Sequence, residues 1–232
     1  MSEAVQVPRQ RPEVPPASPC CNAPSWWNGW RRVFPVVVLA LGAAAQREER
    51  WLARSKCSTC RAAWTLFPPG WQPGHQFQPD AVARAVAARA VGKQSFRAAG
   101  ATIGACASSV RKWTRWCGGV AEPAEALAVA AQLDPEGAHG NGLAARTEHS
   151  GPDRRVAQVL DALESLGAAL VRAGLALASV TGLGRVLEWQ RAVARKTLVV
   201  GAAGSSSPPS ALGVIAKTAV ASNSDGRPRG AG

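Results

Sequence analysis

The central part of the chain carries apolar residues at helical spacing, starting just after Asp80. Four of them recur at intervals of three and four residues and would share one helix face: Val82, Ala85, Val86 and Ala90. Asp80 is a residue type that often caps a helix N-terminus, and Gly92 is typical of a position just beyond a helix C-terminus. The pattern predicts a helix over residues 80–91.

Two further short helices are predicted next, joined by a tight turn. Ser95 is suited to cap a helix over residues 96–103, and Gly104 can adopt the positive φ that the turn requires. A second helix over residues 107–116 has apolar residues on one side and polar and basic residues on the other. With the preceding helix, this arrangement predicts a helix-turn-helix within residues 77–117.

Toward the C-terminus, leucines and valines return at the same helical spacing. They predict a long amphipathic helix from about Asp153, which Gly182 and Gly184 separate from a second amphipathic helix. Two such helices cannot bury their apolar stripes alone. We therefore expect this pair, residues 153–199, either to pack within the chain or to form a homodimer, and the pattern leaves both alternatives open.

In the N-terminal part, β-branched residues predict strands instead. The run over residues 33–41 indicates a strand, residues 42–49 a turn or loop, and residues 50–56 a returning strand. Two strands with cysteines at their ends are typical of a zinc ribbon.

Two cysteines with CxxC spacing follow the returning strand, and a short turn of this kind directs two thiolates toward one zinc ion. A closed zinc site needs four ligands, and the candidates are Cys20, Cys21, Cys57 and Cys60. Cys20 and Cys21 are adjacent and do not have the CxxC spacing. Ala17 or Ser18 stands where the first ligand of that pair is expected. His75 is a further candidate ligand. The alternative is that the CxxC pair is a remnant with free thiols.

Taken together, the patterns predict a mainly α protein with a small degenerate β zinc ribbon, a three-helix helix-turn-helix, a C-terminal helical pair and disordered ends. The predicted segments are a disordered lead-in (1–19), the zinc-ribbon-like segment (20–76), the helix-turn-helix (77–117), a linker that includes a short Ala-rich helix (118–152), the helical pair (153–199) and a disordered tail (200–232). The lead-in, linker and tail are rich in Pro, Gly, Ala or Ser.

The charge of the chain adds a partner to this picture. A net charge of +12 and a pI near 10.7 favour a polyanion, either nucleic acid or an anionic membrane surface. Residues 80–117 contain seven basic residues and a single acid, so this surface is expected to attract the phosphates of double-stranded DNA. We expect base-edge contacts from Ser108, Ser109 and Lys112, and phosphate contacts from Arg97, Arg111 and Arg115.

Several sequence stretches also carry a family resemblance: Cys57-Ser-Thr-Cys60, Trp64-Thr-Leu-Phe-Pro-Pro69, the helix opening near residues 77–82, Ser95-Phe-Arg-Ala-Ala-Gly and Ser108-Ser-Val-Arg-Lys-Trp113. With them, residues 20–117 resemble bacterial proteins that join a zinc ribbon to a helix-turn-helix and look like the DNA-binding heads of insertion-sequence transposases. The last stretch is close to the S-T-V-R-R-W pattern of that family's recognition helix. The resemblance implies DNA binding and a mobile-element origin, but no reaction.

The sequence shows no catalytic constellation, so we expect no enzyme and no small-molecule substrate. A transposase nuclease needs acids gathered on a sheet to hold two metal ions. The acids after Cys117 instead lie on predicted helices and in loops, and neither GxGxxG nor a P-loop occurs.

Two other functions stay open. Residues 33–45 follow Arg31-Arg32 and superficially resemble a twin-arginine export signal, which would make this an exported or membrane-surface protein led by Arg31 to Ala45. This stretch of 13 residues is shorter than the roughly 20 that span a bilayer. The C-terminal helices could instead serve a protein-interaction module. Without a transmembrane segment, and with a reducing compartment suiting the cysteines, we expect a cytoplasmic protein.

Overall fold

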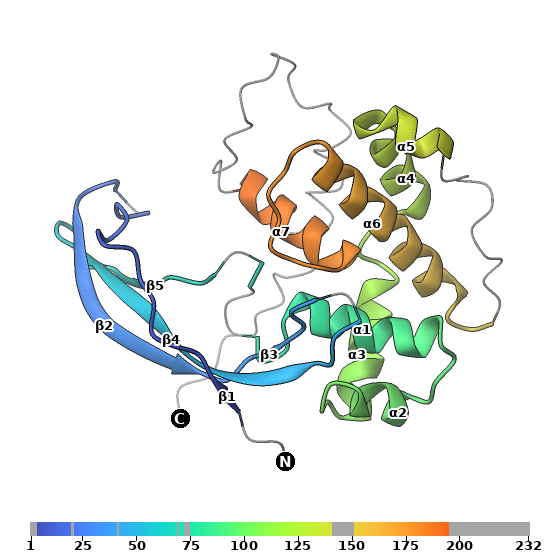
Figure 1. Ribbon diagram of the computed structural model, residues 1–232, viewed down its shortest axis with the longest axis horizontal. Helices are drawn as coiled ribbons and strands as arrows, with labels where there is room; N and C mark the ends of the chain where they lie inside the picture. Colours follow the sequence, from blue (N-terminus) through green and yellow to red (C-terminus); the bar gives the residue numbers. More distant parts are fainter. Residues whose placement is uncertain are drawn as a thin grey trace.

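The computed structural model describes residues 4–19, 21–40, 42–68, 70–71, 75–140 and 151–194. The strands in these ranges are β1 (Val5–Gln6), β2 (Ser25–Val33), β3 (Val36–Val37), β4 (Gln46–Cys57) and β5 (Ala63–Thr65). The helices are α1 (Pro79–Ala90), α2 (Phe96–Ala101), α3 (Ala107–Cys117), α4 (Pro123–Leu133), α5 (Pro135–Gly140), α6 (Arg154–Arg172) and α7 (Gly182–Ala194). The strands lie to one side of the helices (Figure 1).

The sheet is built around β4, which is 12 residues long. On one edge it pairs antiparallel with β2 and β3, and on the other it pairs antiparallel with β5 and parallel with β1. The β2–β4 ribbon curves away from the helices, and the end of β4 lies far from them (Figure 1). The fold is therefore a mixture of α and β with a mixed five-stranded sheet, and the expectation of a mainly α protein was wrong. Because β4 pairs with other strands along both of its edges, the sheet is larger than the small ribbon that was predicted.

The first strand of the ribbon lies earlier in the chain than predicted. β2 contains Trp26, Trp27 and Trp30, because aromatic residues fit a pleated surface as well as β-branched ones do. Of residues 33–40, the described part of the predicted strand over residues 33–41, only Val33, the last residue of β2, and the two residues of β3 are in strands. The apolar run packs against helices instead.

That apolar run is tied to the start of the helical part. The Val36 N–H donates to the Gln76 carbonyl at 2.7 Å, and the Gln78 N–H donates to the Val36 carbonyl at 3.0 Å. Val36 and Val38 are buried in a cluster of α1, α2 and α3 residues that includes Ala85. The centre of the segment considered as an export leader, Val36 to Val38, is thus buried in the fold. None of the helices in the described ranges has the length and apolar character needed to cross a bilayer.

The lead-in was expected to be disordered, and this expectation was wrong for residues 4–19. β1 pairs with residues 48–49 of β4. Arg9 and Arg11 lie over tryptophan rings of the ribbon, and Ser18 is buried. These contacts compensate for the few large apolar groups of the segment, because a guanidinium stacks favourably on an indole face.

The predicted cap before α2 and the predicted turn before α3 are confirmed, although α2 ends at Ala101, two residues earlier than predicted. The Ser95 hydroxyl accepts a hydrogen bond from the Ala98 N–H at 3.1 Å and caps α2, and Gly104 has a φ of 70° in the turn before α3. Gly100 allows the close approach at this turn, because an added Cβ would lie 2.4 Å from the Ala105 carbonyl oxygen.

Asp80 was predicted to cap α1, and this prediction was wrong. The N-cap is Gln78, and the buried Asp80 carboxylate instead accepts hydrogen bonds from the N–H groups of Val180 and Thr181, at 3.2 and 3.0 Å, and from the Thr181 hydroxyl, at 2.6 Å. This contact joins α1 to the chain just before α7. An aspartate can accept hydrogen bonds from the N–H groups at the start of its own helix, and it can equally accept them from N–H groups near the start of a distant helix.

The second core is formed largely by α6, whose stripe includes the fully buried Leu163, Leu166 and Leu170. This stripe packs within the chain against α4, α7 and α1. The predicted linker over residues 118–152 contains α5 and also α4, where Val129 and Ala130 belong to the same core. The short helix foreseen within this segment is thus structural rather than part of a spacer.

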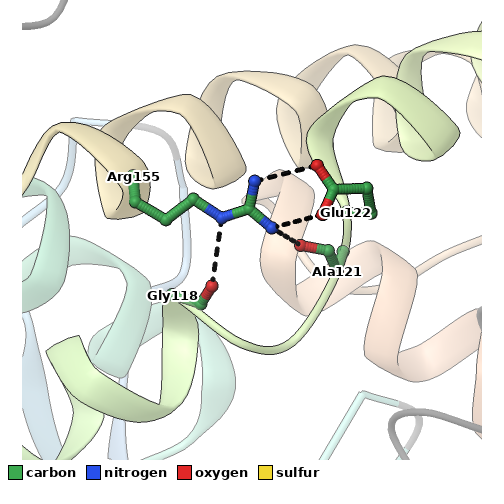
Figure 2. A network of polar contacts seen from close by, with 4 residues as sticks. All are labelled: Gly118, Ala121, Glu122 and Arg155. Carbon is green, nitrogen blue, oxygen red and sulfur yellow. Dashed lines mark hydrogen bonds and ion pairs between the residues drawn. The ribbon is translucent and has the colours of Figure 1, made fainter.

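The start of α6 is fastened to the loop between α3 and α4 by a polar network (Figure 2). The Arg155 guanidinium donates to both carboxylate oxygens of Glu122, at 2.8 and 2.7 Å, and to the carbonyls of Gly118 and Ala121, each at 3.4 Å. The guanidinium holds the pKa of the Glu122 carboxyl below its usual value, mainly through this hydrogen bonding. The network thus links α3 to the core around α6.

Candidate metal centre and nucleic-acid interface

Three cysteines converge where β4 ends and the chain enters β2: Cys21, Cys57 and Cys60. Their sulfur atoms all lie within 4.8 Å of one another, and the Cys21 and Cys57 sulfurs are 3.3 Å apart. Three thiols at this spacing can hold one metal ion. Within the described residues, this is the one group of three or more His, Cys, Asp or Glu side chains with that geometry.

The turn after β4 directs two of these thiols and stabilises a thiolate. The N–H groups of Thr59 and Cys60 both point at the Cys57 sulfur, each at 3.4 Å. The Ser18 hydroxyl, these two N–H groups and Cys21 lower the pKa of Cys57 to about 6, although burial acts in the opposite direction. A thiol that ionises near neutral pH is prepared for metal binding, since the thiolate is the ligand.

The candidate ligands fare differently in the structure. It brings together Cys21, Cys57 and Cys60, whereas Cys20 lies outside the described residues. His75 does not belong to the cluster and instead lines a cleft with Phe77 and Trp113, where residues of α1, α3 and α7 meet. Ser18, which had been noted only as standing where a ligand was missing, is buried and hydrogen-bonded to Cys57.

The second candidate site is the outer face of α3. Arg111, Lys112 and Arg115 are exposed there. Val110, Thr114 and Cys117 face inward and are buried, and the Thr114 hydroxyl donates to the Val110 carbonyl at 2.9 Å. Ser108 and Arg97 are also exposed, and Ser109 is half-buried. The predicted DNA-contacting residues therefore lie on α3 and the neighbouring α2.

The N-terminus of α3 has a feature that the sequence reading missed. Cys106 is the N-cap residue of α3, and its sulfur lies 3.1 Å from the Ser108 hydroxyl and 3.2 Å from the Ser109 hydroxyl. These hydroxyls, together with the backbone N–H groups of the same two serines, lower the pKa of Cys106 to about 7. The exposed thiol is therefore partly ionised at neutral pH.

The ribbon carries arginines that stack on tryptophans. The Arg9 guanidinium lies 4.2 Å from the centre of a Trp51 ring, and that of Arg11 lies 5.1 Å from a Trp27 ring. Arg32 pairs with Glu49 at 2.8 Å. The tryptophans and arginines within residues 26–32 were a visible signal for such a face, whereas nothing in the sequence of the lead-in showed that its arginines would contribute to it.

Comparison with known proteins gives no match: no family model, no curated protein and no solved structure is detectably similar to the chain. The functional reading therefore rests on the residues and their geometry.

Proposed function

We propose that this protein binds double-stranded DNA through a helix-turn-helix formed by α2 and α3, with α3 entering the major groove. The observation that supports this best is the division of α3 into a buried apolar face and an exposed face with Arg111, Lys112 and Arg115. An exposed basic helix that is held by two others is the arrangement with which such motifs contact DNA.

The turn between α2 and α3 supports the same proposal. Gly100 permits close packing of α2 against the start of α3, and the positive φ of Gly104 reverses the chain. The two helices are thereby held at one angle, which a helix needs in order to enter a groove as a rigid body. In this arrangement Ser108, Ser109 and Lys112 approach base edges, while Arg97, Arg111 and Arg115 contact phosphates.

The proposal includes zinc as the metal of the cysteine cluster. Thiolates are soft ligands that select zinc among the divalent ions of a reducing cytoplasm, where we place the protein. The zinc would join the turn before β2 to the turn after β4, at one end of the ribbon, and has no catalytic part. This assignment keeps the resemblance to transposase DNA-binding heads as the working hypothesis for the origin of the chain.

The test is a salt titration of full-length protein on random duplex DNA, with zinc content measured on the same sample. Steeply salt-dependent binding is expected, because each neutralised phosphate releases counterions. The variant Lys112→Ala/Arg115→Ala is compared with Arg172→Ala. Arg172 is exposed on α6 about 24 Å along the helix from Val156, where α6 meets the end of α3.

We expect the α3 variant to bind more weakly and to have a salt slope smaller by roughly one, because Arg115 is the one of the two residues that is assigned to a phosphate. Arg172→Ala should match the wild type. Equal behaviour of the two variants would refute the proposed interface, and absence of binding at low salt would refute DNA binding altogether.

A further inference from the structure

Two turns meet at the cysteine cluster, and their backbones follow the same scheme. In the turn after β4, the Cys57 N–H donates to the carbonyl of Ala62, five residues later, at 2.9 Å. In the turn before β2, the Ser18 N–H donates to the carbonyl of Ala23, also five residues later and also at 2.9 Å. Both are closed by the same long-range bond across the turn.

The dihedral angles repeat as well. The fifth residue of each turn is left-handed although it is not glycine: Arg61 has a φ of 62° and Asn22 a φ of 56°. Within the described residues, Lys93 is the one other non-glycine residue with a positive φ. Such a conformation costs free energy in ordinary residues, so its occurrence at matching positions marks two copies of one turn rather than coincidence.

When the two turns are aligned residue by residue from their first residues, Ser18 corresponds to Cys57 and Cys21 corresponds to Cys60. Cys20 then corresponds to Thr59, which lies between the two ligand positions of its own turn. The chain thus has a CxxC turn and an SxxC turn facing each other. They are held side by side because Ser58 N–H donates to the Pro24 carbonyl at 3.0 Å, and Ser25 pairs with Cys57 in the ribbon.

We infer that Ser18 occupies the fourth ligand position of the metal centre, the position that Cys57 takes in the opposite turn. Ser18 is 2% exposed, its hydroxyl oxygen lies 3.8 Å from the Cys21 sulfur, and its hydroxyl is hydrogen-bonded to the Cys57 sulfur. The hydroxyl therefore lies beside the Cys21 and Cys57 sulfurs, and the inference places it at the fourth corner of a tetrahedron around the metal.

This assignment changes the chemistry of the site. Three thiolates and a neutral hydroxyl leave a zinc ion with one weak oxygen ligand, so the fourth position exchanges more readily than in a four-thiolate site. The centre is one substitution away from a closed structural site, Ser18→Cys. The inference rests on the proposed zinc, but it is tested by variants that separate the two.

The experiment measures zinc on the purified full chain by competition with a chelator and by X-ray absorption at the zinc edge. The wild type should show three sulfurs at about 2.3 Å and one oxygen at about 2.0 to 2.2 Å. Ser18→Cys should show four sulfurs and bind zinc at least about tenfold more tightly. Replacing a ligand is expected to change the metal affinity more than replacing a residue that only contacts a ligand.

Cys20→Ser is the matched control, because Cys20 is the rival ligand. We expect this variant to keep three sulfurs and the wild-type affinity. Loss of a sulfur or of affinity in Cys20→Ser, or three sulfurs in a folded Ser18→Cys variant, would overturn the assignment. If Ser18→Cys fails to fold, Ser18→Ala is measured instead: weaker zinc binding than in the wild type would support the assignment, and unchanged binding would overturn it, because a water molecule would then be the oxygen ligand.

Two outcomes separate this inference from the proposed function. If the wild type binds no zinc but Ser18→Cys binds one, zinc in the natural protein is refuted while position 18 is still assigned to the fourth corner. If neither binds zinc, both ideas fall. DNA binding is measured independently of either result.

Discussion

Both the ribbon and α3 are rich in arginine, but the two regions use their charge differently. On the ribbon, Arg9 and Arg11 lie over tryptophan rings and Arg32 pairs with Glu49. On α3, Lys112 and Arg115 project from an exposed face, and neither forms an ion pair with any residue in the described ranges. A basic composition alone therefore does not locate a nucleic-acid surface; what matters is whether each cation already has a partner.

The largest expected effect is on DNA affinity, when two basic residues are removed from each region in turn and the two variants are compared in one assay. Lys112→Ala/Arg115→Ala should weaken DNA binding by about 100-fold at low salt, because it removes free cations from the proposed interface. Arg9→Ala/Arg11→Ala removes the same charge from stacked positions and should weaken binding less than about threefold. Fluorescence anisotropy with a labelled duplex measures both. The reverse order of effects would move the interface to the ribbon.

A second prediction disturbs α2 and α3 without changing any charge. In Gly100→Ala the added Cβ would lie 2.4 Å from the Ala105 carbonyl oxygen, which is backbone and cannot rotate away. We expect a loss of about 2 to 3 kcal/mol in the free energy of unfolding, measured by urea denaturation, together with weaker DNA binding.

Gly119→Ala is the matched control for this glycine. Its Cβ would meet the Trp116 carbonyl oxygen at 3.8 Å, an ordinary contact, and stability should change by less than about 0.5 kcal/mol. A Gly100 variant as stable as this control would show that the close approach of α2 and α3 is not needed.

Alkylation of Cys106 sharpens the comparison chemically. Because the pKa of Cys106 is lowered to about 7, its reactive thiolate fraction should rise about tenfold between pH 6 and pH 8, and the labelling rate with iodoacetamide with it. Burial raises the pKa of Cys117 to about 12, so that thiol should stay unlabelled. Peptide mass spectrometry follows both sites.

Bound duplex DNA should protect Cys106, which lies at the start of α3. Labelling at an unchanged rate in saturating DNA would argue that the N-terminus of α3 lies outside the interface.

The smallest expected effect concerns the network of Figure 2. Arg155 and Glu122 are both about half exposed, so water screens their attraction. Arg155→Ala should lower the melting temperature by only about 2 °C and leave DNA binding unchanged, as circular dichroism and anisotropy can show. A much larger drop would indicate that the contacts to the Gly118 and Ala121 carbonyls hold α3 in place.

The helical part was predictable where the signals are local. The Ser95 cap, the turn at Gly104 and the apolar period of α1 act over a few residues, so they can be read in a single stretch. The same reasoning found the apolar stripe of α6, but not what covers it. Packing inside one chain and packing between two chains need the same stripe.

The sheet and the site depended on partners far away in the chain. Asp80 was assigned to its own helix, yet it binds residues about 100 positions later. The tryptophans of β2 and the arginines of the lead-in form a strand and a stacked face only once β4 lies between them. Such pairings depend on register, which no local pattern contains.

The sequence by itself determined the helices around α3, the charge of the molecule and the CxxC half of the candidate metal centre, since each depends on neighbouring residues. Only the tertiary structure decided the second half of that centre. Reading along the chain pointed to the adjacent cysteines Cys20 and Cys21, of which the structure describes Cys21; the fold brings Cys21 to Cys57 and Cys60 and places Ser18 against Cys57. The reason is geometric: a metal site is selected by the turns that meet in space, and these turns meet only after β2 and β4 have paired.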